Sequence, residues 1–178
     1  MRTRERIVDE LLVLAAQARQ VDAFERLASR WNPRLLRHAR RLTDDPEGAR
    51  DAVQEAWLSI ARGLGGLQDP ACFGSWALRI TSRRCADWIA RRRRTRQRLC
   101  EIDAAADVPT PTEDPGEDLW RVREVIRGLG PEQRALMAMY YIEDLSVGEI
   151  AEVLGVPVGT VKSRLYHARE RLRAVLEV

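Results

Sequence analysis

The chain has 178 residues, of which 45% are hydrophobic and 32% charged, a length that allows one or two small globular domains and excludes a large barrel enzyme. No stretch approaches the roughly 18 uncharged apolar residues that a membrane helix needs, and the first residues lack the apolar core of a signal peptide, so we expect a cytoplasmic protein without membrane insertion. Cys72, Cys85 and Cys100 form no CxxC pair and predict neither disulfides nor a metal site.

The formal net charge of +3 conceals a very uneven distribution along the chain. Residues 79–98 hold nine arginines and one acid, Asp87, whereas residues 101–118 hold seven acids and no base. Three prolines and few large apolar residues accompany these acids, which predicts an extended acidic linker over 99–118. The linker divides the chain into two expected domains, 1–98 and 119–178.

Apolar residues recur at spacings of three and four in the first domain, and strictly alternating β-branched runs are missing, which favours an all-α fold. Pro33 suits a first helical turn and therefore predicts a helix boundary after Trp31. Residues 43–47 combine capping side chains with a proline and an acid, a pattern typical of a helix start. The expected helices are 7–19, 22–31, 33–42, 47–62 and 71–94, with a glycine-rich break at 63–70 before the last one.

In the second domain we expect helices over 119–129 and 131–142, followed by a short helix that begins with a capping box formed by Ser146 and Glu149. Gly155 ends that helix, and a final helix covers about 158–176. A small residue, a glycine turn and an apolar anchor at Ala151, Gly155 and Val161 have the spacing of a helix-turn-helix. A plain helical hairpin is the alternative interpretation.

The face of the last helix opposite its apolar stripe carries the polar groups of a DNA reader. Val161, Leu165, Ala168 and Leu172 form the stripe that must face the core. Thr160, Ser163, Tyr166, His167 and Glu170 are expected to lie away from that stripe, with Lys162 at one edge, so that the first two turns meet base edges. The arginines expected to reach phosphates are Arg164, Arg169, Arg171 and Arg173. His167 alone could equally be an ordinary surface histidine.

Two helices of the first domain have unusual outward faces. On the helix 47–62 an apolar side chain lies among polar and acidic groups, which suits a basic and partly hydrophobic partner, although a solvated acidic face is the alternative. On the helix 71–94 a tryptophan lies beside arginines, as in single-strand binders, although that tryptophan could instead belong to the core. The residues of these two faces are Asp51, Gln54, Glu55, Leu58 and Arg62 on the first helix, and Trp76, Arg79, Arg83 and Asp87 on the second.

Taken in order, these segments resemble the bacterial sigma factors of RNA polymerase, and in particular their extracytoplasmic-function subgroup. The resemblance spans about residues 21–176. It rests on segments 24–25, 33–36, 44–47 and 51–57 for core binding, 73–80 and 87–94 for promoter melting, and 129–134, 148–155 and 159–164 for the DNA-binding fourth region.

The resemblance implies a protein that binds core RNA polymerase through its β and β′ subunits, and also promoter DNA and an anti-sigma factor. It implies that Asp51, Gln54, Glu55 and Leu58 dock on the β′ subunit. It places Gly65 and Gly66, with Trp76, Arg79 and Arg83, at the minus-10 element, and it assigns the minus-35 element to Thr160, Lys162, Ser163, Arg164, Tyr166, His167, Arg169 and Arg171.

Two other classes of protein fit the sequence less well. A helix-turn-helix regulator of the response-regulator type has similar last helices, but it needs a receiver domain whose alternating strands are missing from the first hundred residues. An enzyme is disfavoured because the sequence shows no phosphate loop and no metal-ligand cluster, and its two histidines, His38 and His167, fall in different domains. We therefore expect no catalytic residue, no cofactor and no metal.

Overall fold

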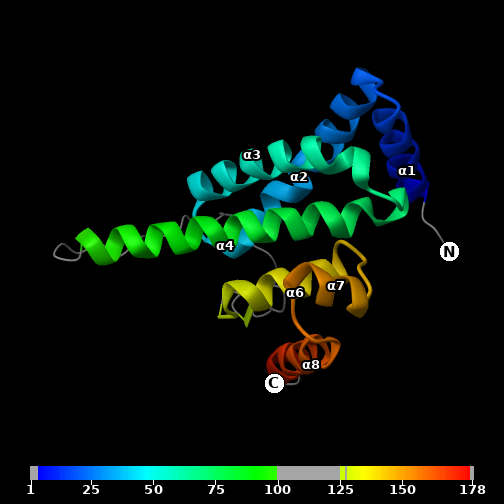
Figure 1. The fold of residues 1–178 in the computed structure, drawn as a ribbon. Helices are drawn as coiled ribbons and strands as arrows, with labels where there is room; N and C mark the ends of the chain where they lie inside the picture. The colour runs from blue at the N-terminus through cyan, green and yellow to red at the C-terminus, as the bar shows by residue number, and fades with distance from the viewer. Residues whose placement is uncertain (1–3, 100–124, 127, 177–178) are drawn as a thin grey trace, which may run out of the picture.

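The computed structural model describes residues 4–99, 125–126 and 128–176, and all regular secondary structure within these residues is helical. The helices form two groups (Figure 1). The N-terminal unit consists of α1 (Arg4–Gln17), α2 (Val21–Thr43), α3 (Pro46–Gly63), two short 3₁₀ turns (Leu64–Gly66 and Pro70–Cys72) and α4 (Phe73–Leu99). The C-terminal unit consists of α6 (Pro131–Tyr141), α7 (Val147–Leu154) and α8 (Val158–Leu176). The all-α prediction is confirmed.

The two helices predicted on either side of Pro33 are one continuous helix, α2, and the predicted boundary is wrong. Pro33 removes one backbone hydrogen bond, but its ring is exposed, so water can satisfy the freed carbonyl. The helix continues because residues on both sides of the proline are buried in one core stripe. That stripe contains Ala23, Leu27, Trp31, Leu35, His38 and Ala39.

The start of α3 follows the predicted capping pattern. The Asp45 carboxylate accepts a 2.8 Å hydrogen bond from the Gly48 amide, and this bond lowers the pKa of Asp45, as does the Arg92 guanidinium that pairs with it. Gly48 lies against the ring of Trp88 on α4, and a Cβ at this position would overlap that ring. The glycine therefore lets α3 and α4 approach closely.

The expected turn between the last two helices is also present. The Ser146 hydroxyl accepts from the Glu149 amide at 3.2 Å, and the Glu149 carboxylate accepts from the Ser146 amide at 2.8 Å, which completes the capping box. Gly155 ends α7 in the left-handed conformation, with φ of 65°. Of the predicted helix 119–129, most residues lie outside the part of the chain that the structure describes, as does most of the predicted linker 99–118.

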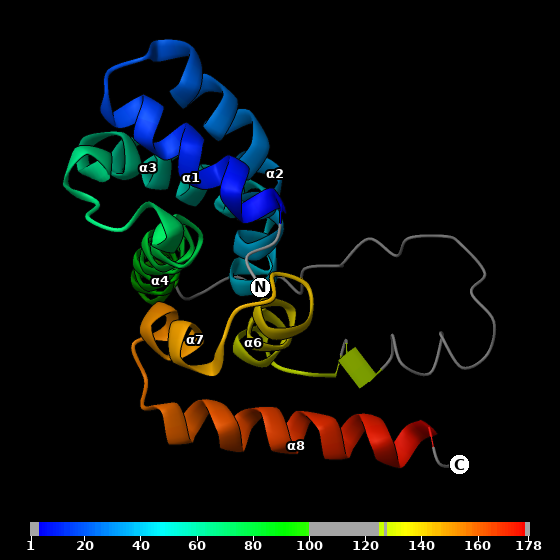
Figure 2. The same cartoon turned by 90° about the vertical axis from the view of Figure 1, so that its right-hand side faces the viewer.

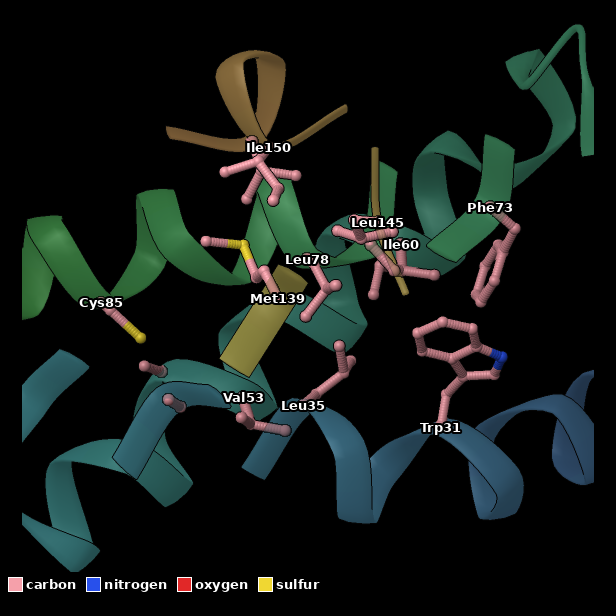
Figure 3. Close-up of a cluster of buried hydrophobic side chains, with 14 of the residues drawn as sticks. Trp31, Leu35, Val53, Ile60, Phe73, Leu78, Cys85, Met139, Leu145 and Ile150 are labelled. Atoms are coloured by element: carbon pink, nitrogen blue, oxygen red, sulfur yellow. The ribbon is translucent and has the colours of Figure 1, made fainter. Parts of the chain in front are cut away.

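The two units pack directly against each other, an arrangement that the sequence did not predict. Helices α6 and α7 form a layer between α4 and α8, so α4 and α8 lie on opposite sides of that layer (Figures 1 and 2). Met139, Leu145 and Ile150 belong to the same buried cluster as Leu35 and Leu78 (Figure 3). The hydrophobic core is therefore continuous from one unit to the other.

None of the described helices combines the length and the apolar composition needed to cross a bilayer.

Candidate nucleic-acid interface

The predicted base-reading face of α8 points away from the rest of the protein. Val161, Leu165 and Ala168 are buried against the C-terminal unit, as predicted, and this orientation leaves the opposite side in solvent. Tyr166 is 60% exposed, and its ring lies edge-on to that of His167 with 5.6 Å between the centroids. Lys162, Ser163 and His167 are exposed as well, whereas Thr160 is half-buried. These five side chains can face a single groove.

The arginines of α8 are less free than the sequence suggested. Arg164 forms a 3.1 Å ion pair with Glu132 of α6. The Arg169 guanidinium donates to the Tyr141 hydroxyl at 2.7 Å and lies over the ring of Tyr140, and these contacts raise its pKa. Arg171 makes a long contact of 3.5 Å with the Gly128 carbonyl. To contact phosphate, Arg164 and Arg169 would thus have to leave their present partners, Glu132 and Tyr141, in the C-terminal unit.

On α4, Arg79 and Arg83 are exposed, one helical turn apart, on the side that faces the C-terminal unit. A cleft of about 970 Å³ separates the two surfaces. Arg79, Arg83 and Arg93 line it on one side, and Glu132 and Glu152 line it on the other, together with the Arg164 that pairs with Glu132. The predicted strand-contacting arginines thus face acidic side chains of the same protein.

Trp76 has a structural role in addition to any binding role. Its ring is half-buried, lies 6.1 Å from that of Phe73 and would contact a Cβ built on Gly63 at 3.1 Å. Trp76 therefore supports the end of α3 at the point where the 3₁₀ turn with Gly65 and Gly66 begins. The position of Trp76 is compatible both with a core role and with stacking on a DNA base, because part of the ring reaches solvent.

Gln17 of α1 fixes the glycine turn, and sequence reasoning missed this residue. Its side-chain amide donates to the carbonyls of Leu64 and Leu67 at 2.9 and 2.8 Å, so the turn is closed around one amide group. Beyond Gly65 and Gly66 no atom lies within 4 Å of a Cβ position, which leaves that side of the turn open to a ligand. No sequence pattern links Gln17 to a turn some fifty residues away.

The outward face of α3 has the composition that the sequence predicted. Asp51 and Gln54 are exposed, Leu58 is 55% exposed, and Glu55 forms a 2.9 Å ion pair with Arg91 of α4. Helix α3 itself lies on the side of α4 away from the C-terminal unit, above α4 in Figure 1. It remains accessible while the two units are packed together.

A buried polar pair connects α2 to α4 beneath these surfaces. His38 Nε2 lies 2.8 Å from the Ser82 hydroxyl, and burial, with the nearby Arg41 charge as a smaller cause, lowers the pKa of His38 to about 4. Burial also raises the pKa of the Cys85 thiol to about 12, so this cysteine behaves as an apolar core residue. Within the described residues, no group of three or more His, Cys, Asp or Glu side chains could hold a metal ion.

Two protein families match the chain. Residues 27–95 match the family described as Sigma-70 region 2, and residues 119–172 match the family described as Sigma-70, region 4. The first match covers α3 and most of α2 and α4, and the second includes α6, α7 and most of α8. Helix α1 precedes both matches.

Relatives of known name extend these matches over both units. The ECF RNA polymerase sigma factor SigM of Mycobacterium tuberculosis is 34% identical over 169 residues, which cover 94% of this chain and 84% of that protein. SigE of Mycolicibacterium smegmatis is 32% identical over 86% of this chain, which spans 62% of the length of that relative. Among solved structures, the sigma factor RpoE of Bartonella quintana, in complex with the anti-sigma factor NepR, shares the fold with a TM-score of 0.72 at 22% identity, covering 89% of this chain and 99% of that one.

Proposed function

Because the chain belongs to the extracytoplasmic-function sigma factors of bacterial RNA polymerase, we propose that it binds core polymerase through α3 and directs it to promoters by contacts to two DNA elements. The observation that carries this proposal is that two chemically different surfaces lie on separate parts of the protein. An acidic and apolar face and a polar recognition face lie on different units, and both point outward. The chain then acts by binding, and the chemistry of transcription belongs to the polymerase.

We assign core binding to the outward face of α3. Leu58 offers an exposed apolar side chain, and Asp51 and Glu55 offer charge on the same face, with Gln54 between them. Such a face fits a partner surface that is basic at its rim and apolar at its centre. Helical segments of the β′ subunit would supply that partner, with the β subunit nearby.

The minus-10 element is assigned to the glycine turn and the adjacent face of α4. Gly65 and Gly66 leave room for an extruded base, and Trp76 lies next to the turn through its contact with Gly63. Arg79 and Arg83 continue along the same helix and can meet the phosphates of the opened strand. The charge of these arginines supplies affinity, and the turn supplies selectivity.

The minus-35 element is assigned to α8, whose first turns present Thr160, Lys162, Ser163, Tyr166 and His167. A helix in this position can enter the major groove with polar side chains against base edges. The phosphate contacts come from Arg164, Arg169 and Arg171 after they exchange their present partners.

Regulation by an anti-sigma factor completes the proposal. The Bartonella protein is bound by such a factor, although at 22% identity the likeness concerns the fold. A partner that covers either the α3 face or the α8 face would block one of the two assigned contacts. This regulation and the binding of polymerase both place the protein in the cytoplasm.

The test is co-purification of the full chain with core polymerase, followed by run-off transcription on genomic fragments. The double variant Asp51→Arg with Leu58→Glu should weaken core binding at least about 100-fold. The first change reverses the charge of one side chain, and the second puts a carboxylate at the apolar centre of the contact with polymerase. Asp22→Arg with Leu11→Glu makes the same chemical changes on exposed positions of α2 and α1 and should bind like the wild type. Equal binding of both double variants would refute the α3 assignment.

A further inference from the structure

Helix α1 exposes a stripe of apolar side chains on the face that points away from the protein. Ile7, Leu11 and Leu14 are 46%, 61% and 51% exposed. Ala18 is exposed as well, and its amide still donates to the Leu14 carbonyl, so it continues the helix by one residue. The spacings of four, three and four residues place all four side chains on one side of the helix. We call these four residues the α1 stripe.

The acidic side chains of α1 are in part used on its other side. Asp9 is 6% exposed and forms a 2.6 Å ion pair with Arg30 of α2, and Glu5 forms one of the same length with Arg34. A surface helix usually has the reverse arrangement, with charged groups in solvent and apolar groups in the core. Exposed apolar residues that adjoin one another in a row indicate a contact with a partner.

The α1 stripe belongs to none of the surfaces assigned above. The two family matches begin at residues 27 and 119, so neither includes α1. In Figure 1, α1 lies at the end of the N-terminal unit where α4 begins, at the opposite end from the arginine-rich last turns of α4. The protein side of α1 holds the glycine turn through Gln17, which leaves the outer face available for a separate contact.

The α1 stripe is complementary to itself. The order of its spacings, four, three and four, is the same from either end. A second copy that lies antiparallel therefore places Leu11 opposite Leu14, and Ile7 opposite Ala18. A large side chain then meets a small one at each end, which allows the two helices to approach closely. Self-complementarity of this kind is what a two-fold symmetric contact requires.

The charges around the α1 stripe also favour an antiparallel copy. Arg4 is exposed at one end, and Arg19 and Asp22 are exposed at the other. In an antiparallel pair, Arg4 of one copy meets an end that holds one base and one acid. A parallel pair would instead place Arg4 opposite Arg4 and Asp22 opposite Asp22, which is repulsive at both ends. The macrodipoles of two antiparallel helices attract each other as well.

We propose that α1 is a self-association surface, on which two copies of the chain pack their α1 stripes antiparallel about a two-fold axis. A pair of helices of this length buries on the order of 1,000 Å² in total, near the lower limit of specific interfaces. The dimer is therefore reversible, with an expected dissociation constant on the order of 10 µM. The proposal does not depend on the polymerase and DNA contacts assigned above.

Sedimentation equilibrium of the full chain, at concentrations below and above that constant, tests the dimer. The wild type should change from monomer to dimer as its concentration rises. Leu11→Lys should weaken dimerisation at least about tenfold, because the two-fold axis brings a charge into the apolar contact twice. Ile142→Lys makes a similar change at a residue of the C-terminal unit that is 61% exposed, and it should dimerise like the wild type.

Disulfide trapping tests the antiparallel orientation. The background carries Cys72→Ser and Cys100→Ser and keeps Cys85, which is buried. A chain with Ile7→Cys is mixed with a chain with Ala18→Cys, and the mixture is oxidised. Antiparallel packing should link the two different chains and neither chain to itself. The two positions are about 16 Å apart along a helix that rises about 1.5 Å per residue, and a disulfide needs Cα atoms within about 7 Å.

Each result bears directly on the proposal. A wild type that stays monomeric at every concentration would overturn it, and the α1 stripe would then be assigned to a helix of another protein. Dimerisation of Leu11→Lys at wild-type strength would show that the dimer forms elsewhere. Leu14→Lys provides a second variant of the α1 stripe, and circular dichroism checks that both variants are folded. Self-linked Ile7→Cys chains would overturn the antiparallel arrangement.

Discussion

Helices α4 and α8 are both long, rich in arginine and assigned to DNA, but they are held in very different ways. Helix α4 contacts α2 and α3 of its own unit and α7 of the other one, and its position depends on Gly48 against Trp88 and on His38 against Ser82. Among the described helices, α8 packs mainly on α6 and α7 of its own unit, through a single stripe that includes Val161 and Leu165.

This difference has a consequence for function. A helix enclosed on several sides can be displaced only by disturbing its neighbours, so changes beneath α4 should affect stability first. A helix held along one stripe leaves most of its surface free, so changes on α8 should affect recognition and leave the fold intact.

The largest effect is expected where α3 and α4 approach each other. Gly48→Ala places a Cβ in the space of the Trp88 ring and should lower the free energy of unfolding by about 3 kcal/mol. Gly159→Ala on α8 is the matched control, because no atom lies within 4 Å of its Cβ position, and it should be neutral or slightly stabilising. Chemical denaturation of both variants provides the measurement, and equal losses would show that α4 is no more tightly enclosed than α8.

The start of α3 shows which parts of the fold the sequence could predict. Asp45 at the N-cap and the capping box of Ser146 and Glu149 are local patterns, in which every partner lies within three residues, and both are present as predicted. The apolar stripe of α8 is also local, since helical periodicity alone determines it. By contrast, the boundary predicted at Pro33 is wrong, because burial of a shared stripe outweighs a local helix-breaking preference.

The parts that could not be predicted involve contacts between distant segments. Neither Glu143 nor Arg134, whose ion pairs join the two units, belongs to a periodic pattern, so the packing of the two units was not foreseen. The role of Gln17 at the glycine turn and the partners of Arg164 and Arg169 likewise depend on tertiary geometry. For the candidate site, sequence reasoning found outward faces but could not say which of them would be covered.

The second variant concerns the buried histidine between α2 and α4. The folded protein keeps His38 neutral, with a pKa of about 4, whereas the unfolded chain has the ordinary value of 6.5. The unfolded state therefore binds a proton between these values, and stability that is complete above pH 6.5 decreases as the pH falls toward 4. By pH 5 this loss should reach about 2 kcal/mol.

His38→Gln isolates that contribution. Glutamine can still hydrogen-bond to Ser82 but does not titrate, so the stability of the variant should depend less on pH between 6.5 and 4 than that of the wild type. Urea unfolding at pH 8 and pH 5 supplies the four values needed. If the stability of the wild type and that of His38→Gln depended equally on pH, His38 would bind its proton in the folded protein as readily as in the unfolded chain. Helix α4 would then be less tightly enclosed than its buried contacts indicate.

The third prediction separates two kinds of residue on α8. His167→Ala removes an expected base contact and should weaken binding about tenfold, about 1.4 kcal/mol, at one or two positions of the minus-35 element. Arg171→Ala removes an expected phosphate contact and should weaken all sequences alike, with a salt dependence reduced by about one charge. Binding of the full chain to a randomised minus-35 library at two salt concentrations distinguishes these outcomes, and a reversed pattern would mean that α8 is rotated from its assigned orientation.

The smallest effect is expected at the cap of α7, which helps to position α8 without touching it. Ser146→Ala removes the hydroxyl that accepts from the Glu149 amide and should cost about 1 kcal/mol of stability, the usual value of an N-cap. Ser146→Asp keeps an acceptor at the helix N-terminus and should recover most of the loss. If capping only supports the fold, both variants keep the base preference of the wild type, because Val161 and Leu165 still hold α8 in place. Altered preference in Ser146→Ala alone would show that the turn helps to set the orientation of the recognition helix, and that α8 depends on its neighbours more than its single buried stripe implies. Thermal unfolding together with the minus-35 library measures both properties on the same samples.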